Sequence, residues 1–182
     1  MIRPATPTDA FFAAPLIQET IGDIGLALTG ARRNEEAEPI IAAFFRQPAN
    51  RLSFENTFVA ELGGRPAGLL IAYDGARAHD LDAPFRERLR TLGLRNHIDS
   101  ETSAGEFYLD TIVVQAAHRG RGLAKRLILA AEEEARTLGL PTALLVSPSN
   151  TVAWNLYRSV GYEEDARVTV AGHAYAHLVK RP

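Results

Sequence analysis

Apolar residues in the first fifty positions recur at helical spacing. A short strand is predicted at 2–5, after which Thr8 and Asp9 supply capping oxygens for a helix that runs to about Gly22. A second helix is predicted to begin at Asn34, because acidic residues follow it directly and suit the positive end of a helix dipole. The buried stripe of this second helix is expected to hold Ile40, Ile41, Phe44 and Phe45.

The next segment contains two apolar runs that flank a turn. Residues 57–62 and 67–73 lie on either side of Gly63-Gly64-Arg65-Pro66, and adjacent glycines between apolar runs are typical of a β-hairpin because both tolerate positive φ. From 74 to 103 the chain becomes polar, with one helix predicted at 82–94. We interpret residues 74–103 as an insertion between strands, which either forms part of a site or is a surface excursion without a role.

The second half of the chain alternates strands and helices. Its strongest strand lies at 106–114, where nearly every residue is a β-former, and this density indicates a central strand buried on both faces. The elements predicted after it are a helix at 123–138, a strand at 142–146, a helix at 150–159 and strands at 168–170 and 174–179. Because no internal repeat or linker interrupts the chain, we expect one domain over residues 1–182.

Composition narrows the class of protein. Of the 182 residues, 46% are hydrophobic and 23% charged, which is typical of one soluble globular domain. With a formal net charge of −2, the chain lacks the positive electrostatic field of a general nucleic-acid binder, so we expect no nucleic-acid partner. The absence of cysteine excludes disulfides, thiolate metal sites and a cysteine nucleophile. Since neither a signal-peptide pattern nor an apolar run of ~18 residues is found, we expect a cytoplasmic protein without a membrane partner.

A glycine-rich turn stands between the central strand and the helix after it. The sequence Arg119-Gly120-Arg121-Gly122 leads directly into Leu123, and glycines there let a phosphate approach the unpaired N–H groups of the first helical turn. With Lys125 and Arg126 nearby, the ligand that this turn favours is multiply charged, such as a pyrophosphate. The turn lacks the GxxxxGKS/T run of a nucleotide P-loop and the position of a dinucleotide fingerprint. Taken alone, it is either an anion site or a helix cap.

Two sequence blocks resemble the GNAT superfamily of acyl-CoA-dependent N-acyltransferases. The segment 119–124 is similar to that family's pyrophosphate signature: Gln or Arg, two variable residues, Gly, one variable residue, and Gly or Ala. The segment 150–162 is similar to a second block, in which an Asn opens a helix that carries a Tyr and ends in Gly and an aromatic residue. The specific motifs lie between about Leu109 and Tyr162, and the rest matches in general plan. The resemblance implies an α/β fold, with a central, mixed, mostly antiparallel sheet flanked by helices on both faces.

The resemblance also implies which residues bind acetyl-CoA, the expected co-substrate. Free backbone groups of the central strand would pair with the pantetheine arm, here those of Ile112, Val113 and Val114. The pyrophosphate would be held by the backbone N–H groups of Arg121, Gly122, Leu123 and Ala124. Arg119 either contributes its side chain or shapes the loop, and Lys125, Arg126 and Arg158 are alternatives for the 3′-phosphate. The N–H of Val114 is expected to polarise the thioester carbonyl.

Tyr157 is the expected general acid. It lies four residues after Ala153 and seven after Asn150, so the three share one helical face. By resemblance, Asn150 binds near the pantetheine and Tyr157 protonates the departing CoA thiolate, a transfer that suits a phenol with an ordinary pKa of ~10. The alternative is that Tyr157 only fills the core.

The incoming amine must lose a proton, so a base is also needed. Period-two alternation puts Tyr108, Asp110, Ile112 and Val114 on one side of the central strand, and Glu106 shares that side. A carboxylate in such an apolar strand is costly unless it is used or paired. Asp110 is therefore the first candidate for base or amine anchor, and Glu106 is the second. The alternative for Asp110 is a purely structural pair with an arginine.

These features together predict an N-acetyltransferase that works by direct attack in a ternary complex. The alternative is a non-catalytic acyl-CoA-binding sensor or interaction module. The five histidines do not have the spacing of a metal site, so no metal is expected. By resemblance, the acceptor walls come from the N-terminal helices, the insertion and the last strands, which carry no motif that identifies the acceptor. The sequence does not decide whether the acceptor is a small-molecule or a peptide amine. It also does not decide whether the protein forms a homodimer.

Overall fold

The computed structural model describes residues 1–181, which form one seven-stranded sheet with helices around it. The strands are β1 Ile2–Pro4, β2 Thr57–Leu62, β3 Arg65–Asp74, β4 Phe107–Val114, β5 Thr142–Val146, β6 Glu163–Val170 and β7 His173–Lys180. The α-helices are α1 Ala10–Ile21, α2 Asp23–Thr29, α3 Asn34–Phe45, α4 Ala78–Leu81, α5 Ala83–Thr91, α6 Leu123–Thr137 and α7 Thr151–Ser159. The strand order is β1-β2-β3-β4-β5-β7-β6, and of these neighbours only β4 and β5 are parallel. The mixed, mostly antiparallel sheet is confirmed.

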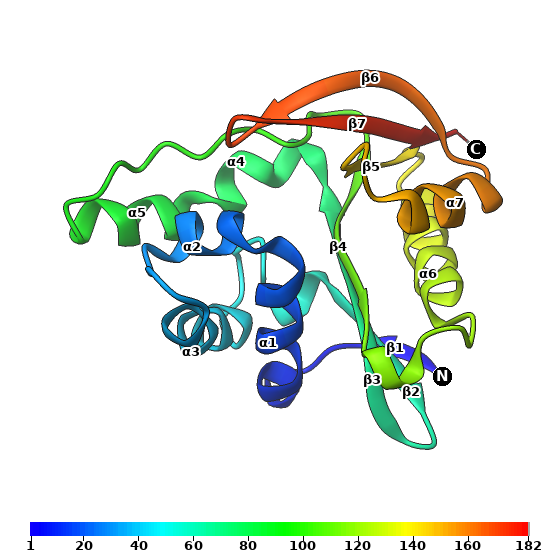
Figure 1. Ribbon diagram of the computed structural model, residues 1–182, viewed down its shortest axis with the longest axis horizontal. Coiled ribbons are helices and arrows are strands. Elements are labelled where there is room, and N and C mark those ends of the chain that lie inside the picture. The colour runs from blue at the N-terminus through cyan, green and yellow to red at the C-terminus, as the bar shows by residue number, and fades with distance from the viewer. Residues whose placement is uncertain (182) are drawn as a thin grey trace.

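The sheet separates two hydrophobic cores (Figure 1). Helices α1, α2, α3 and α5 lie on one side of it, and α6 and α7 lie on the other. Along β3, Leu69 and Ile71 belong to the first core, whereas Leu70 and Ala72 belong to the second. This alternation buries both faces of the central strands, as the density of apolar residues indicates. The expected helices on both faces are confirmed.

Three segments differ from the sequence prediction. The helix predicted at 82–94 is observed as α5, Ala83–Thr91, with Pro84 in its first turn, where a missing N–H is tolerated, and the short helix α4 before it was not predicted. Helix α2 was not predicted; it starts directly after Gly22, whose φ of 49° ends α1. Strand β6 begins at Glu163 rather than 168, since it is an edge strand whose first residues are exposed and carry no apolar pattern.

Helices α1 and α2 meet at a sharp angle. Among residues 1–181, no single helix is long and apolar enough to cross a membrane. The segments Pro7–Ile21 and Asp23–Thr29 pass that test only as a pair, bent by 116°. Both contribute to the first core, where Ile17 and Leu28 are buried.

Candidate functional site

Strands β4 and β5 separate after two residue pairs and leave a cleft. Their parallel register contains only Phe107 with Thr142 and Tyr108 with Ala143. Beyond these pairs the two facing strand edges do not bond to each other, and such an edge is able to take an extended ligand arm in the manner of a strand. A cleft of about 310 Å³ lies here, lined from β4 by Tyr108, Asp110 and Ile112 and from α7 by Ala153 and Tyr157.

The glycine turn that follows β4 is open. Gly120 and Gly122 have φ values of 75° and 73°, and a Cβ built on either would meet no atom within 4 Å. Within residues 1–181 no side chain caps α6, so the N–H groups of its first turn are available to a ligand. Arg119 donates from Nε to the carbonyl oxygen of Val114 at 3.0 Å, which ties the turn to the end of β4. The turn therefore fits a pyrophosphate, with Arg119 in a loop-shaping contact.

The helix α7 brings the predicted residues Asn150 and Tyr157 to the cleft. Asn150 caps the helix, because its Oδ1 accepts a hydrogen bond from the N–H of Ala153 at 3.1 Å. Tyr157 is 9% exposed, and its hydroxyl forms no hydrogen bond with another side chain or the backbone within residues 1–181. Burial raises the pKa of Tyr157 to about 12. The phenol is thus protonated at neutral pH and free to donate.

A β-bulge in β4 changes which residues share a face. In the register with β3, Thr111 pairs with Ile71 and Leu109 pairs with Ala72, so Asp110 is an extra residue. Tyr108 consequently packs in the first core, while Ile112 and Val114 pack against the second. The prediction that all four alternate residues of this strand share one side was wrong. The physical reason is that a bulge reverses the alternation beyond it.

Asp110 lies in a buried ionic network and lines the cleft together with Arg51 and Glu101. Its Oδ2 accepts hydrogen bonds from Nε and Nη2 of Arg51 at 3.0 and 2.7 Å and from the Tyr73 hydroxyl at 2.6 Å. The side chains of Arg51 and Asp110 are each 3% exposed. Burial acts to lower the pKa of Arg51, but the carboxylates of Asp110 and Glu101 hold it well above its usual value. Asp110 is therefore paired with an arginine and also lines the cleft. This geometry is compatible with both predicted roles: a base or amine anchor, and a structural ion pair.

Arg51 and Glu101 are cleft residues that sequence reasoning missed. Arg51 follows α3 in a connecting segment, and Glu101 lies near the end of the polar insertion. Glu101 accepts from Nη2 of Arg51 at 2.7 Å and from the Tyr108 hydroxyl at 3.0 Å, which fixes the insertion to β4. Neither residue carries a local signal, because only the tertiary fold brings them to Asp110.

Glu106, the second candidate base, does not line the cleft. Its Oε1 accepts from the Thr102 hydroxyl at 2.5 Å, and its Oε2 lies 3.0 Å from Nε2 of His177. The other ring nitrogen of His177 lies 2.6 Å from Oδ1 of Asp165. Hydrogen bonding to Glu106 and then Asp165 outweighs partial burial and raises the pKa of His177 to about 9. These contacts join the insertion end to β6 and β7.

The raised pKa of His177 predicts a pH-dependent contribution to stability. The folded pKa of about 9 lies above the ordinary 6.5, so the contribution is fully present below pH 6.5 and is lost as pH rises through 9. After allowance for solvent screening, we expect about 1–2 kcal/mol. Urea unfolding at pH 6 and 9.5 should show His177→Gln less stable than wild type at pH 6 and nearly equal at pH 9.5. A difference that is the same at both pH values would contradict this assignment.

Comparisons with known proteins agree with this geometry. A family model described as Acetyltransferase (GNAT) family matches residues 24–162, more than half of the chain. An acetyltransferase crystal structure is 31% identical, with a TM-score of 0.82, over 100% of this chain and 98% of that one. An N-acetyltransferase from Staphylococcus aureus Mu50 is 26% identical, with a TM-score of 0.87, over 99% of this chain and 100% of that one.

A more distant structure shows the fold alone. The paia N-acetyltransferase from Thermoplasma acidophilum, in complex with coenzyme A, is 14% identical, with a TM-score of 0.58, over 100% of this chain and 98% of that one. Among curated proteins, none matches the chain significantly. The family match and the two closer structures lead to one conclusion. This chain belongs to the GNAT family of acetyltransferases.

Proposed function

We propose that this protein transfers the acetyl group of acetyl-CoA to a primary amine of a small-molecule or peptide acceptor, by direct attack in a ternary complex. The observation that best supports this proposal is the cleft where β4 and β5 separate, with the free hydroxyl of Tyr157 in its wall. The uncapped N-terminus of α6 follows the carboxyl end of β4, so one ligand is able to reach both.

Backbone groups would hold the co-substrate. The N–H groups of Arg121, Gly122, Leu123 and Ala124 bind the pyrophosphate, and the free backbone groups of the segment Ile112, Val113 and Val114 pair with the pantetheine arm. The N–H of Val114 polarises the thioester carbonyl. For the 3′-phosphate, Lys125 and Arg126 are favoured over Arg158, whose guanidinium lies 5.1 Å from the centroid of the Trp154 ring.

Direct attack requires two proton movements. The amine nitrogen forms a bond to the carbonyl carbon, the carbon–sulfur bond breaks, and Tyr157 donates a proton to the leaving sulfur. The amine gives up its own proton to a base, for which we propose Asp110, directly or through a water. Glu106 stays the second candidate, but it faces His177 and not the cleft.

Substitution of Gly122 by Asp tests the co-substrate site. The new carboxylate repels a pyrophosphate, and like charges in contact cost several kcal/mol, so we expect acetyl-CoA affinity to fall about 100-fold or more. The measurement is isothermal titration of the purified protein with acetyl-CoA. Wild type should bind at micromolar concentration.

The chain offers a matched control in Gly139→Asp. Gly139 lies at the other end of α6, has a φ of 68° and also has no atom within 4 Å of a built Cβ. This variant carries the same strain and charge and should bind like wild type. The proposal fails if wild type binds neither acetyl-CoA, CoA nor longer acyl-CoAs. The turn is then only a helix cap.

A further inference from the structure

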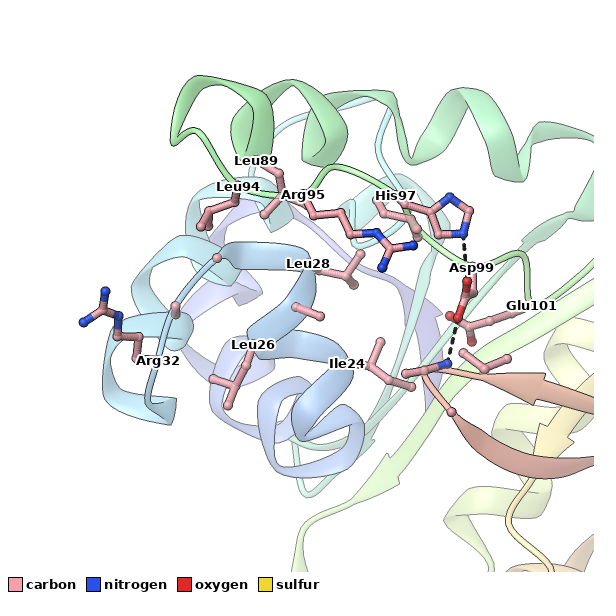
Figure 2. A pocket seen from close by; sticks show the side chains of 17 residues that line it. Ile24, Leu26, Leu28, Arg32, Leu89, Leu94, Arg95, His97, Asp99 and Glu101 are labelled. Atoms are coloured by element: carbon pink, nitrogen blue, oxygen red, sulfur yellow. Dashed lines mark hydrogen bonds and ion pairs between the residues drawn. The ribbon is translucent and has the colours of Figure 1, made fainter.

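A larger chamber, whose lining side chains are drawn in Figure 2, shares residues with the cleft. Its volume is about 670 Å³, within the range of small-molecule sites, and it is lined by residues of three segments: 24–32, 89–101 and 170–172. Ile24, Leu28, Glu101 and Val170 line both the chamber and the cleft. A molecule in the chamber would therefore reach Glu101 at the border of the cleft that Asp110 and Tyr157 line.

The boundary between chamber and cleft carries surplus negative charge. Arg51 is the cation of the buried network, and it lies 2.7 Å from Asp110, 2.7 Å from Glu101 and 3.5 Å from Asp82. Burial raises the pKa of Asp82, but the carboxylates of Asp110 and Glu101 alone outnumber the single guanidinium. A buried excess of carboxylate favours a cation at this point.

Much of the chamber lining is apolar. The apolar walls are formed by Ile24, Leu26, Leu28, Leu94 and Ile98. Leu94 belongs to the insertion and is 47% exposed, which leaves apolar surface for a ligand to cover.

A cationic side chain also lines the chamber. The guanidinium of Arg95 points into the chamber toward Leu28, whereas that of Arg32 points away (Figure 2). Arg95 is exposed and forms no hydrogen bond or ion pair with another residue of the described range 1–181, although its charge contributes to lowering the pKa of Asp99. Asp99, on the same segment, already bonds to Nε2 of His97 at 2.9 Å and to the N–H of Ala171 at 2.8 Å. Arg95 is thus positioned to meet an anion from a ligand.

We propose that the chamber binds an acceptor with three parts: an ammonium, an apolar aliphatic or aromatic body, and a carboxylate or other anionic group. The ammonium meets Glu101 at the cleft, the body packs on the apolar walls, and the anion meets Arg95. This inference rests on the proposed acetyl transfer and adds the chemical class of the acceptor. The insertion then lines the acceptor site and determines which acceptor binds.

Two amines that share a phenylethylamine body test the assignment. 4-(2-Aminoethyl)benzoate carries the carboxylate, and 2-(4-methylphenyl)ethylamine replaces it by a methyl group. Wild type should acetylate the carboxylated amine with a kcat/KM about 10-fold higher or more, since a charge-assisted hydrogen bond is lost with the methyl group. Arg95→Gln should remove this preference by raising KM for the carboxylated amine alone.

Two further variants complete the experiment. Arg90→Gln, on the exposed face of α5 where Arg90 pairs with Glu87, is the matched control and should keep the preference. Ala27→Phe adds a ring at an exposed chamber residue and should raise KM for both amines while KM for acetyl-CoA stays unchanged. Equal use of the two amines by wild type, or a preference that survives in Arg95→Gln, overturns the assignment.

Calorimetry separates this inference from the proposed function. If no acetyl transfer to either amine occurs, the CoA-saturated protein is titrated with 4-(2-aminoethyl)benzoate. Binding by wild type that is lost in Arg95→Gln supports the chamber while the transfer proposal fails. Absence of binding by wild type overturns the chamber itself.

Discussion

Replacement of Tyr157 by Phe is expected to lower kcat by about 10²–10⁴-fold, the usual contribution of a positioned general acid. The phenylalanine ring keeps the packing against Tyr162, whose ring centroid lies 5.9 Å away, so KM for acetyl-CoA should change little. Only the hydroxyl is removed, and no other residue in the range 1–181 bonds to it. The measurement is steady-state thiol release with a saturating amine.

The pH profile adds a second readout for Tyr157. Its pKa of about 12 keeps the phenol protonated over the whole assay range, so wild-type activity should show no alkaline loss from this group between pH 7 and 10. The same burial would raise the pKa of a thiolate that leaves into the cleft, because both charged forms are anions. The pKa values of the phenol and of the leaving thiol are therefore closer to each other than the raised pKa of the phenol alone would suggest.

Tyr162→Phe is the matched control for Tyr157→Phe. The Tyr162 hydroxyl donates to Oγ1 of Thr142 at 2.8 Å within the core, away from the cleft lining. Its loss should reduce stability slightly and leave kcat within about twofold of wild type, as expected for a hydrogen bond remote from the chemistry. If Tyr157→Phe also keeps kcat within that range, Tyr157 only fills the core and the proposed acid is refuted.

Local signals in the sequence were sufficient for the turn and for α7. Glycines at 120 and 122 adopt the positive φ that their residue type permits, and Asn150 caps its helix as its side chain allows. These features depend on residues within a few positions of one another. The same holds for the hairpin at Gly63 and Gly64, where both glycines have positive φ.

The features that the sequence did not predict depend on contacts between residues that are far apart in the chain. The bulge at Asp110 contains no glycine and becomes visible only in the register of β4 against β3. Arg51 meets Asp110 across 59 positions of sequence, and Glu101 meets Arg51 across 50. The hydrophobic periodicity of the chain does not reveal contacts between residues so far apart in sequence. The chamber is assembled in the same way from three distant segments. The cytoplasmic location and the homodimer stay predictions.

Replacement of Arg51 by Ala is expected to reduce the free energy of unfolding by about 3–5 kcal/mol, the cost of breaking a buried ion pair on one side. The variant leaves Asp110 and Glu101 without the guanidinium that donates to both, in a place where each side chain is at most 11% exposed. Domains of this kind are stable by about 5–15 kcal/mol, so the variant should lose a large part of its stability. Urea unfolding at pH 7 measures the difference.

The surface pair of Arg90 with Glu87 provides the matched control. These side chains are 67% and 61% exposed, so Arg90→Ala should cost less than about 1 kcal/mol. Combining Arg51→Ala with Asp110→Asn should recover part of the loss, because a neutral amide needs no buried counter-charge, and this recovery distinguishes lost charge pairing from lost packing. If Arg51→Ala costs no more than the surface control, solvent reaches the carboxylates freely, and the surplus negative charge that we assign to the cleft has no electrostatic basis.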